Sequence, residues 1–239
     1  MRVRAGAPRW AAYLAPLSSI CDSWWSTIQE GGIMKKSIAV FLVFTAAMAA
    51  HLSNAYAAEK HLIYIHGCCI NKVGSSAYED IVKNLKASGF KVTFDIRRDE
   101  SDDDIKAYAL KVAEQVNALL VSGASPEDIT VVGYSQGAVV ALYAAINIAN
   151  PNVNYVLLAG CPGPRARRFD IDYSKVQGRV LSIIDVKDDR FMTCKGILSE
   201  SVLQKEITLD SGYGHEVFRR SDEKSIQLWK EPLESWAKR

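Results

Sequence analysis

Residues 128–149 read DITVVGYSQGAVVALYAAINIA, and this stretch decides the fold. The β-forming run at 129–133 predicts a buried strand, and the alanine- and valine-rich run at 136–149 predicts a helix. Between them lies the pattern G-x-S-x-G, Gly133-Tyr134-Ser135-Gln136-Gly137. This pattern turns the chain sharply from strand into helix, and both glycines are required because side chains there would collide with the neighbouring strand and helix. Ser135 at the apex is therefore a predicted nucleophile, and the N–H of Gln136 is predicted to hold an oxyanion.

Strand and helix patterns alternate on both sides of this stretch. Apolar or alternating runs predict strands at 61–66, 90–96, 154–159, 180–184 and 205–209, and the period-two run at 90–96 is typical of a strand near a sheet edge. Helical spacing predicts helices at 77–87, at 104–121 and at 221–237, the last one broken near Pro232. The acidic run at 99–104 is expected to be a solvated loop and helix N-cap. The alternation predicts an α/β fold, a doubly wound and mostly parallel sheet of about six strands with helices on both faces.

The composition is that of an ordinary globular chain and narrows the possible functions. The chain has 239 residues, of which 49% are hydrophobic and 23% charged, which suits one large domain or one domain plus a further segment. A net charge of +2 without a Lys/Arg stripe argues against nucleic-acid binding. The sequence has no Gly-rich phosphate loop, and its cysteines lack the histidine spacing of a zinc site. Neither a metal nor an organic cofactor is expected.

The first 57 residues have the pattern of a targeting segment. The basic stub MKK at 34–36, the apolar run at 37–50 and the small-x-small site AYA at 55–57 predict a signal peptide at 34–57. The apolar run is short for a bilayer span, so no stable membrane anchor is expected after cleavage. Residues 1–33 lack hydrophobic periodicity and are interpreted as the product of a mis-assigned start codon, or as an extended leader. The mature domain is then 58–239, periplasmic or secreted after cleavage near Ala57-Ala58.

Two further loops are expected close to Ser135, because the carboxyl ends of parallel strands meet at the same edge of a sheet. After the strand at 61–66, Gly67 lets the backbone pass near the nucleophile, and the N–H of Cys68 is the candidate second oxyanion donor. His66 is expected to buttress this loop through hydrogen bonds rather than to act as the base. After the last strand, the glycine-rich run at 212–214 lets a short loop carry His215 inward as the general base.

Three carboxylates follow the strand at 180–184 and compete to hold the imidazole in the correct tautomer and to stabilise its cation. Asp188 lies a few residues past the strand and is the preferred candidate. Asp189 and Asp185 are the next choices, and Asp185 comes directly off the strand, where it is expected to sit low relative to His215.

The HG loop at 66–67, the GYSQG turn at 133–137, the late acidic loop and the GYGH loop at 212–215 together resemble a small secreted α/β-hydrolase. The resemblance covers essentially all of residues 60–239, and the chain order Ser…Asp…His is the one that this family uses. It implies esterase, lipase or thioesterase chemistry. The chain lacks the family's first antiparallel strands and its cap domain, so it resembles the minimal members. An open cleft is therefore expected in place of a deep pocket.

Four cysteines remain after the leader, and an even number in an exported chain suggests disulfides. Cys161 and Cys194 follow neighbouring strands at one edge of the sheet and are predicted to form a bridge that fixes the acid-bearing loop; two buried thiols are the alternative. Cys68 and Cys69 could form a strained vicinal disulfide or stay reduced. The arginines at 165, 167 and 168 are interpreted as a solvated loop face rather than as a site for an anionic substrate.

These residues predict a serine hydrolase that cleaves small-molecule carboxylic ester or thioester substrates through an acyl-enzyme on Ser135. A peptidase or an acyltransferase could use the same groups. From a different class, the chain could be a catalytically silent hydrolase fold that serves as a periplasmic binding or scaffold module. The intact Ser–Asp–His set argues against that alternative. The sequence carries no prediction of the oligomeric state.

Overall fold

All six strands of the main sheet run parallel, in the order β2-β1-β3-β4-β6-β8. The computed structural model describes residues 58–97, 101–163 and 169–239. The strands are β1 (His61–Ile65), β2 (Lys91–Phe94), β3 (Ile129–Tyr134), β4 (Asn154–Leu158), β6 (Arg179–Asp185) and β8 (Leu203–Leu209). The order reverses between β1 and β3, which is the switch point of a doubly wound sheet. The predicted α/β class, strand number and parallel sheet are confirmed.

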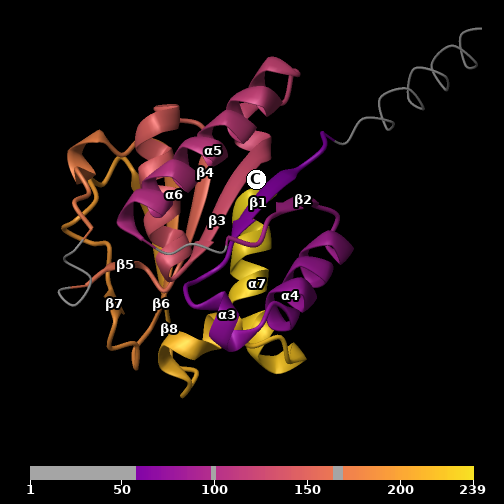
Figure 1. The fold of residues 1–239 in the computed structure, drawn as a ribbon, viewed down its shortest axis with the longest axis vertical. Helices are drawn as coiled ribbons and strands as arrows, with labels where there is room; N and C mark the ends of the chain where they lie inside the picture. Colours follow the sequence, from indigo (N-terminus) through magenta and orange to yellow (C-terminus); the bar gives the residue numbers. More distant parts are fainter. Residues whose placement is uncertain (1–57, 98–100, 164–168) are drawn as a thin grey trace, which may run out of the picture. The chain divides into compact units, whose positions relative to one another are not determined.

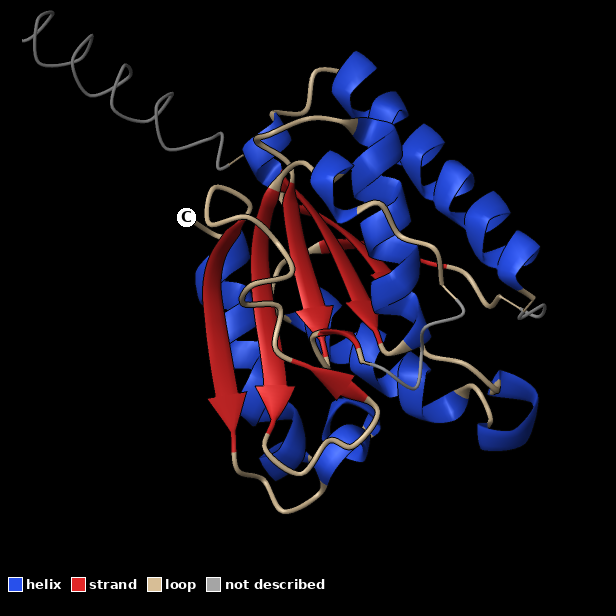
Figure 2. Cartoon of the chain, turned by 90° about the vertical axis from the view of Figure 1, so that its left-hand side faces the viewer, coloured by secondary structure: helices blue, strands red, loops and turns tan. Residues whose placement is uncertain are grey.

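Helices cover both faces of this sheet (Figure 1, Figure 2). On one face, α5 (Asp102–Val121) and α6 (Gln136–Ile148) pack with Ile63 and Ile65 of β1. On the other face, α4 (Ser76–Ala87) and α7 (Glu223–Ala237) pack with Leu62 and Tyr64. Every residue of β1, β3 and β4 is buried because both faces are covered, and their sequences are accordingly continuous apolar runs.

The edge strand and the start of α5 follow the sequence pattern. β2 lies at one edge of the sheet and alternates exposed with half-buried residues, as its period of two predicts. α5 begins with a capping box in which the hydroxyl of Ser101 accepts from the Asp104 N–H, and the Asp104 carboxylate accepts from the Ser101 N–H. The N-cap expected from the acidic run is confirmed, and residues 98–100 of that run lie outside the described residues.

The last helix differs from its prediction. α7 is continuous from Glu223 to Ala237, with Pro232 inside it, so the predicted break is wrong. Buried side chains on both sides of the proline, Trp229 before it and Leu233 and Trp236 after it, hold the helix against the sheet. This packing outweighs the one backbone hydrogen bond that a proline removes.

The remaining elements are short. A second sheet pairs β5 (Cys161–Pro162) with β7 (Phe191–Met192) in antiparallel register, and neither strand is among those that the sequence predicts. Two-residue strands carry no periodicity, so only the tertiary approach of the two loops creates them. The other short elements are α3 (Ile70–Val73), η3 (Pro126–Asp128), η5 (Tyr173–Lys175) and η6 (Gly214–Arg219). Among the described residues, no helix combines the length and the apolarity needed to cross a bilayer.

Candidate active site

Ser135 lies at the tip of the turn between β3 and α6, in a conformation that side chains rarely adopt. Its φ is 54° and its ψ is −118°, and the residue is only 9% exposed. A Cβ on Gly133 would lie 2.2 Å from the Gly137 carbonyl oxygen, and a Cβ on Gly137 would lie 2.2 Å from the Ile65 carbonyl oxygen. The turn therefore admits only glycine at these two positions, for the steric reason that the sequence motif predicts.

His215 reaches Ser135 from η6, immediately after the loop that follows β8. Its Nε2 lies 2.8 Å from the Ser135 Oγ. The rings of Tyr134 and Phe191 lie 5.3 Å from the imidazole, centre to centre, and the Tyr134 hydroxyl donates to the His215 carbonyl oxygen. Gly214, with φ +59°, carries the chain so close to the Lys187 carbonyl oxygen that a Cβ would lie 2.8 Å from it. These contacts fix the ring in the orientation that a proton transfer from Ser135 requires.

Asp188 holds the other side of the imidazole. Its Oδ2 lies 2.7 Å from the His215 Nδ1, while its Oδ1 accepts from the backbone N–H groups of Arg190 and Phe191. The Asp188 side chain is 1% exposed and that of His215 is 6% exposed. A carboxylate at Nδ1 places a proton on that nitrogen and leaves Nε2 as the acceptor toward Ser135. Asp188, His215 and Ser135 thus form one hydrogen-bonded chain.

The two other candidate carboxylates lie elsewhere. Asp185, at the end of β6, accepts from the Lys187 N–H with one oxygen and from the N–H and hydroxyl of Ser211 with the other. Burial alone would raise the pKa of Asp185, but these hydrogen bonds, first of all the one from Ser211, lower it below its usual value. Asp185 therefore ties the end of β6 to the loop after β8. The Asp189 side chain is 65% exposed and lies 4.0 Å from the Arg190 guanidinium.

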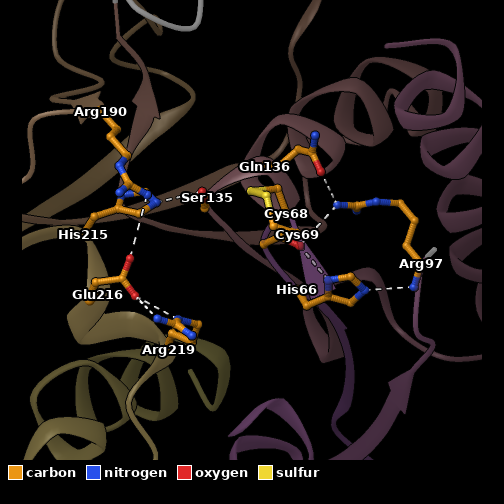
Figure 3. The surroundings of a disulfide bond; sticks show 11 residues. His66, Cys68, Cys69, Arg97, Ser135, Gln136, Arg190, His215, Glu216 and Arg219 are labelled. Atoms are coloured by element: carbon orange, nitrogen blue, oxygen red, sulfur yellow. Dashed lines mark hydrogen bonds and ion pairs between the residues drawn. A yellow bond between two sulfur atoms is a disulfide. The ribbon is translucent and has the colours of Figure 1, made fainter. Parts of the chain in front are cut away.

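The predicted oxyanion residues lie on the side of Ser135 opposite His215 (Figure 3). Gln136 is the first residue of α6, and Cys68 and Cys69 follow β1 and line a cavity together with Ser135. A Cβ on Gly67 would lie 3.0 Å from the Tyr134 ring and 3.4 Å from the Ser135 Cβ, so the backbone passes close to the nucleophile as expected. β1 leads into Gly67 and Cys68, and β3 leads into Ser135 and Gln136; these two strands are neighbours in the sheet, so the residues that follow them lie close together.

Arg97 is a residue of the site that the sequence reasoning missed. It follows β2, is 5% exposed, and its guanidinium donates to the Gln136 side-chain oxygen at 2.6 Å and to the Gly67 carbonyl oxygen at 3.5 Å (Figure 3). The Arg97 N–H also donates to the Nε2 of His66, at 2.8 Å, so His66 carries its proton on Nδ1 and donates it to the Gly67 carbonyl oxygen. His66 braces the loop as predicted. The only signal for Arg97 was its place at the carboxyl end of a strand.

The cavity at Ser135 has a volume of about 260 Å³ and a mixed lining. Two tyrosines, Tyr78 and Tyr134, form part of its wall, and burial raises the pKa of Tyr78 to about 12 and that of Tyr134 well above its usual value. Both phenols therefore stay protonated near neutral pH. Glu216 forms ion pairs with Arg190 and Arg219 on the His215 side of the cavity.

In the part of the chain that the structure describes, no group of three or more His, Cys, Asp or Glu residues is arranged to hold a metal ion.

Two disulfides are present among the described residues. Cys161 of β5 is bonded to Cys194, which follows β7, so the bridge reinforces the small antiparallel sheet beside the Asp188 loop. Cys68 is bonded to its neighbour Cys69. Each pair could have been a disulfide or two free thiols, and in the structure both pairs are disulfides. Arg165, Arg167 and Arg168 lie outside the described residues.

The parallel sheet, the strand-to-helix turn at its centre and the loops at its carboxyl edge define the class of protein: the chain has the α/β-hydrolase fold. Residues 88–184, less than half of the chain, match the family model described as phospholipase/carboxylesterase. No curated protein sequence matches the chain significantly.

Solved structures of the same fold are similar over most of their length. SOBER1 from Arabidopsis thaliana is 15% identical with a TM-score of 0.51, and the match covers 76% of this chain and 98% of that one. A proposed dienelactone hydrolase from Klebsiella pneumoniae subsp. pneumoniae is 15% identical with a TM-score of 0.50, covering 77% of this chain and 89% of that one. At these identities the likeness establishes the fold alone.

Proposed function

We propose that the protein is a serine hydrolase that cleaves carboxylic ester or thioester bonds through an acyl-enzyme on Ser135. The observation that carries the proposal is the hydrogen-bonded chain from Asp188 through His215 to the Ser135 Oγ, which opens into a cavity. The phospholipase/carboxylesterase family match over residues 88–184 supports the same class of chemistry. A binding module would have no need of a buried carboxylate, an oriented imidazole and a serine in a strained turn at one point.

The geometry suits acyl transfer in two steps. The His215 Nε2 takes the Ser135 proton as the Oγ attacks the carbonyl carbon, and the charge that develops on the imidazole is stabilised by Asp188. The N–H groups of Gln136 and Cys68 hold the carbonyl oxygen as it becomes an oxyanion. His215 then passes the proton to the leaving alcohol or thiol, and the same histidine activates water to release the acid.

The size and lining of the cavity favour a small-molecule substrate. A volume of about 260 Å³ is just below the usual range of ligand pockets, and its wall includes Tyr78 and Tyr134 together with the ion-paired Arg190 and Arg219. The cavity is lined by residues of the loops that follow β1 and β3 and by residues of η6, at the carboxyl edge of the sheet.

Reaction of the purified protein with a fluorophosphonate probe, beside Ser135→Ala, tests the proposal. We expect labelling of the wild-type protein at Ser135 and turnover of p-nitrophenyl esters, and at least about a 10³-fold loss of both in the variant. Circular dichroism and thermal unfolding provide the control that both proteins are folded. A well-folded wild-type protein that is neither labelled nor active would overturn the hydrolase mechanism and favour the silent binding module.

We propose further that the enzyme is exported, with residues 34–57 as a signal peptide that is removed. These residues lie outside the described part of the chain, and support comes from the two disulfides within 58–239, since structural disulfides persist in oxidising compartments. Intact-mass measurement of the protein recovered from the extracytoplasmic fraction is expected to give a chain that begins at Ala58. Recovery of the uncleaved chain from the cytoplasm would contradict export.

A further inference from the structure

The Cys68–Cys69 disulfide lies in the wall of the catalytic cavity, on the side where the oxyanion is expected. Both cysteines line the cavity with Ser135 and His215, and Figure 3 shows the bridge between the serine and the Arg97–His66 pair. Cys68 supplies the N–H that the proposed mechanism assigns to the oxyanion. The covalent bridge therefore involves the same residue that would stabilise the transition state.

Hydrogen bonds hold the start of the loop that carries this N–H. At Gly67, the carbonyl oxygen accepts from the His66 Nδ1 at 2.6 Å and from the Arg97 guanidinium at 3.5 Å. At the other end, the loop enters the single helical turn α3 through Cys69, whose φ of 66° and ψ of 32° are left-handed. A residue other than glycine adopts this conformation rarely, and Cys69 makes no side-chain capping hydrogen bond to α3.

We propose that the Cys68–Cys69 disulfide positions the oxyanion loop, by holding Cys69 in its left-handed conformation and the Cys68 N–H toward Ser135. This inference rests on the proposed hydrolase function. A bond between adjacent side chains closes a small ring through the shared peptide unit, which removes rotational freedom from the backbone at this point. The bridge is a positioning element, because it acts on the reaction through the backbone N–H.

Reduction of the bridge is the direct way to remove this constraint. A small dithiol donates two electrons and two protons: the S–S bond breaks, each sulfur gains a proton, and the dithiol closes into its own disulfide. The loop then keeps its hydrogen bonds at Gly67 and loses the covalent link between Cys68 and Cys69. Since a displaced oxyanion donor affects the transition state more than the bound substrate, kcat falls and KM changes little.

The first experiment isolates this bridge from the second one. In the Cys161→Ser/Cys194→Ser background, only Cys68–Cys69 remains among the described disulfides. The oxidised and dithiothreitol-reduced forms of this background are compared, with alkylation and mass spectrometry to confirm which thiols were released. We expect kcat for a p-nitrophenyl ester to fall about 10- to 100-fold on reduction, with KM within about threefold.

The second experiment needs no reductant and no altered second bridge. Cys68→Ser/Cys69→Ser in the otherwise native protein is expected to show the same fall in kcat, and to bind an aryl trifluoromethyl ketone, whose adduct carries an oxyanion, about 10- to 100-fold more weakly. The pH profile of kcat/KM is expected to stay the same. A bridge that only stabilised the fold would lower the melting temperature and leave these ratios unchanged.

Hydrogen–deuterium exchange measures the position of the loop without reference to activity. We expect the amides at 67–70 to exchange at least about tenfold faster in the reduced protein and in the double serine variant, while those at 133–140 stay protected. Unchanged exchange at 67–70 would overturn the proposal, and so would faster exchange with an unaltered kcat. If the oxidised wild-type protein is inactive, that result alone contradicts the proposed hydrolase function. Hydrogen–deuterium exchange at 67–70 then decides separately whether the bridge holds the loop.

Discussion

The turn at 133–137 contains Ser135 and the loop at 66–70 lies beside that serine, but different contacts hold the turn and the loop in place. The turn is held by its backbone, since Gly133 and Gly137 approach neighbouring carbonyl oxygens so closely that no side chain fits. The loop is held by side chains that come from distant positions, the His66 imidazole, the Arg97 guanidinium and a disulfide. The loops that bring Asp188 and His215 are likewise fixed by side-chain hydrogen bonds. Substitutions in the turn should therefore lower mainly the free energy of unfolding, and substitutions in the loops should lower mainly the catalytic activity.

The largest effect is expected at Asp188, where a loop change should remove activity and spare the fold. In Asp188→Asn, the amide oxygen can still accept from Arg190 and Phe191, but the amide nitrogen faces the His215 Nδ1 and favours the wrong tautomer. We expect kcat to fall about 10⁴-fold, measured with a p-nitrophenyl ester. The matched control is Asp189→Asn, whose exposed side chain lies next in sequence and is expected to leave kcat within about threefold. Equal losses in the two variants would contradict the assignment of the acid.

Gly137→Ala should have the next largest effect, on stability. The new Cβ would lie 2.2 Å from the Ile65 carbonyl oxygen and 2.8 Å from that of His66, so β1 and α6 must move apart. We expect the free energy of unfolding, measured by urea titration, to fall by more than about 3 kcal/mol. In Gly67→Ala, the Cβ would meet side chains and no backbone atom, the Tyr134 ring at 3.0 Å and the Ser135 Cβ at 3.4 Å, and we expect a loss below about 1 kcal/mol. Similar losses in the two variants would remove the distinction between the turn and the loop.

The smallest effect concerns Asp185 and depends on pH. Because the folded protein lowers the pKa of Asp185, this carboxylate stabilises the fold above its unfolded pKa, near 3.9, and the stabilisation is lost as the pH falls through the folded pKa. Asp185→Asn turns an amide toward the Ser211 donors, and we expect it to lower the free energy of unfolding by about 2 kcal/mol at pH 7. Urea unfolding at pH 7 and at pH 3 is expected to show the gap narrowing in acid. A gap of the same size at both pH values would contradict the ionic role of Asp185.

The sequence predicted the elements whose cause is local. β1, β3 and β4 have continuous apolar runs, which predict strands buried on both faces, and α5 has the helical spacing of a helix buried on one face. These patterns can be recognised without knowing which elements pack against them. The prediction of a break at Pro232 was wrong because it considered only the backbone of that helix. Burial of Trp229 and Trp236 against the sheet decides the outcome, and such packing is not visible in a window of neighbouring residues.

For the site, the sequence by itself determined the turn at Ser135, because the glycine requirement is a steric property of five consecutive residues. It also restricted the partners to residues that follow the carboxyl ends of strands. The tertiary structure alone decided which of three nearby carboxylates faces His215, since the direction of a side chain in a loop depends on the conformation of that loop. It also decided that Arg97 reaches Gly67 and Gln136. Contacts between residues far apart in the chain depend on how strands are ordered in the sheet, and that order is a property of the whole fold.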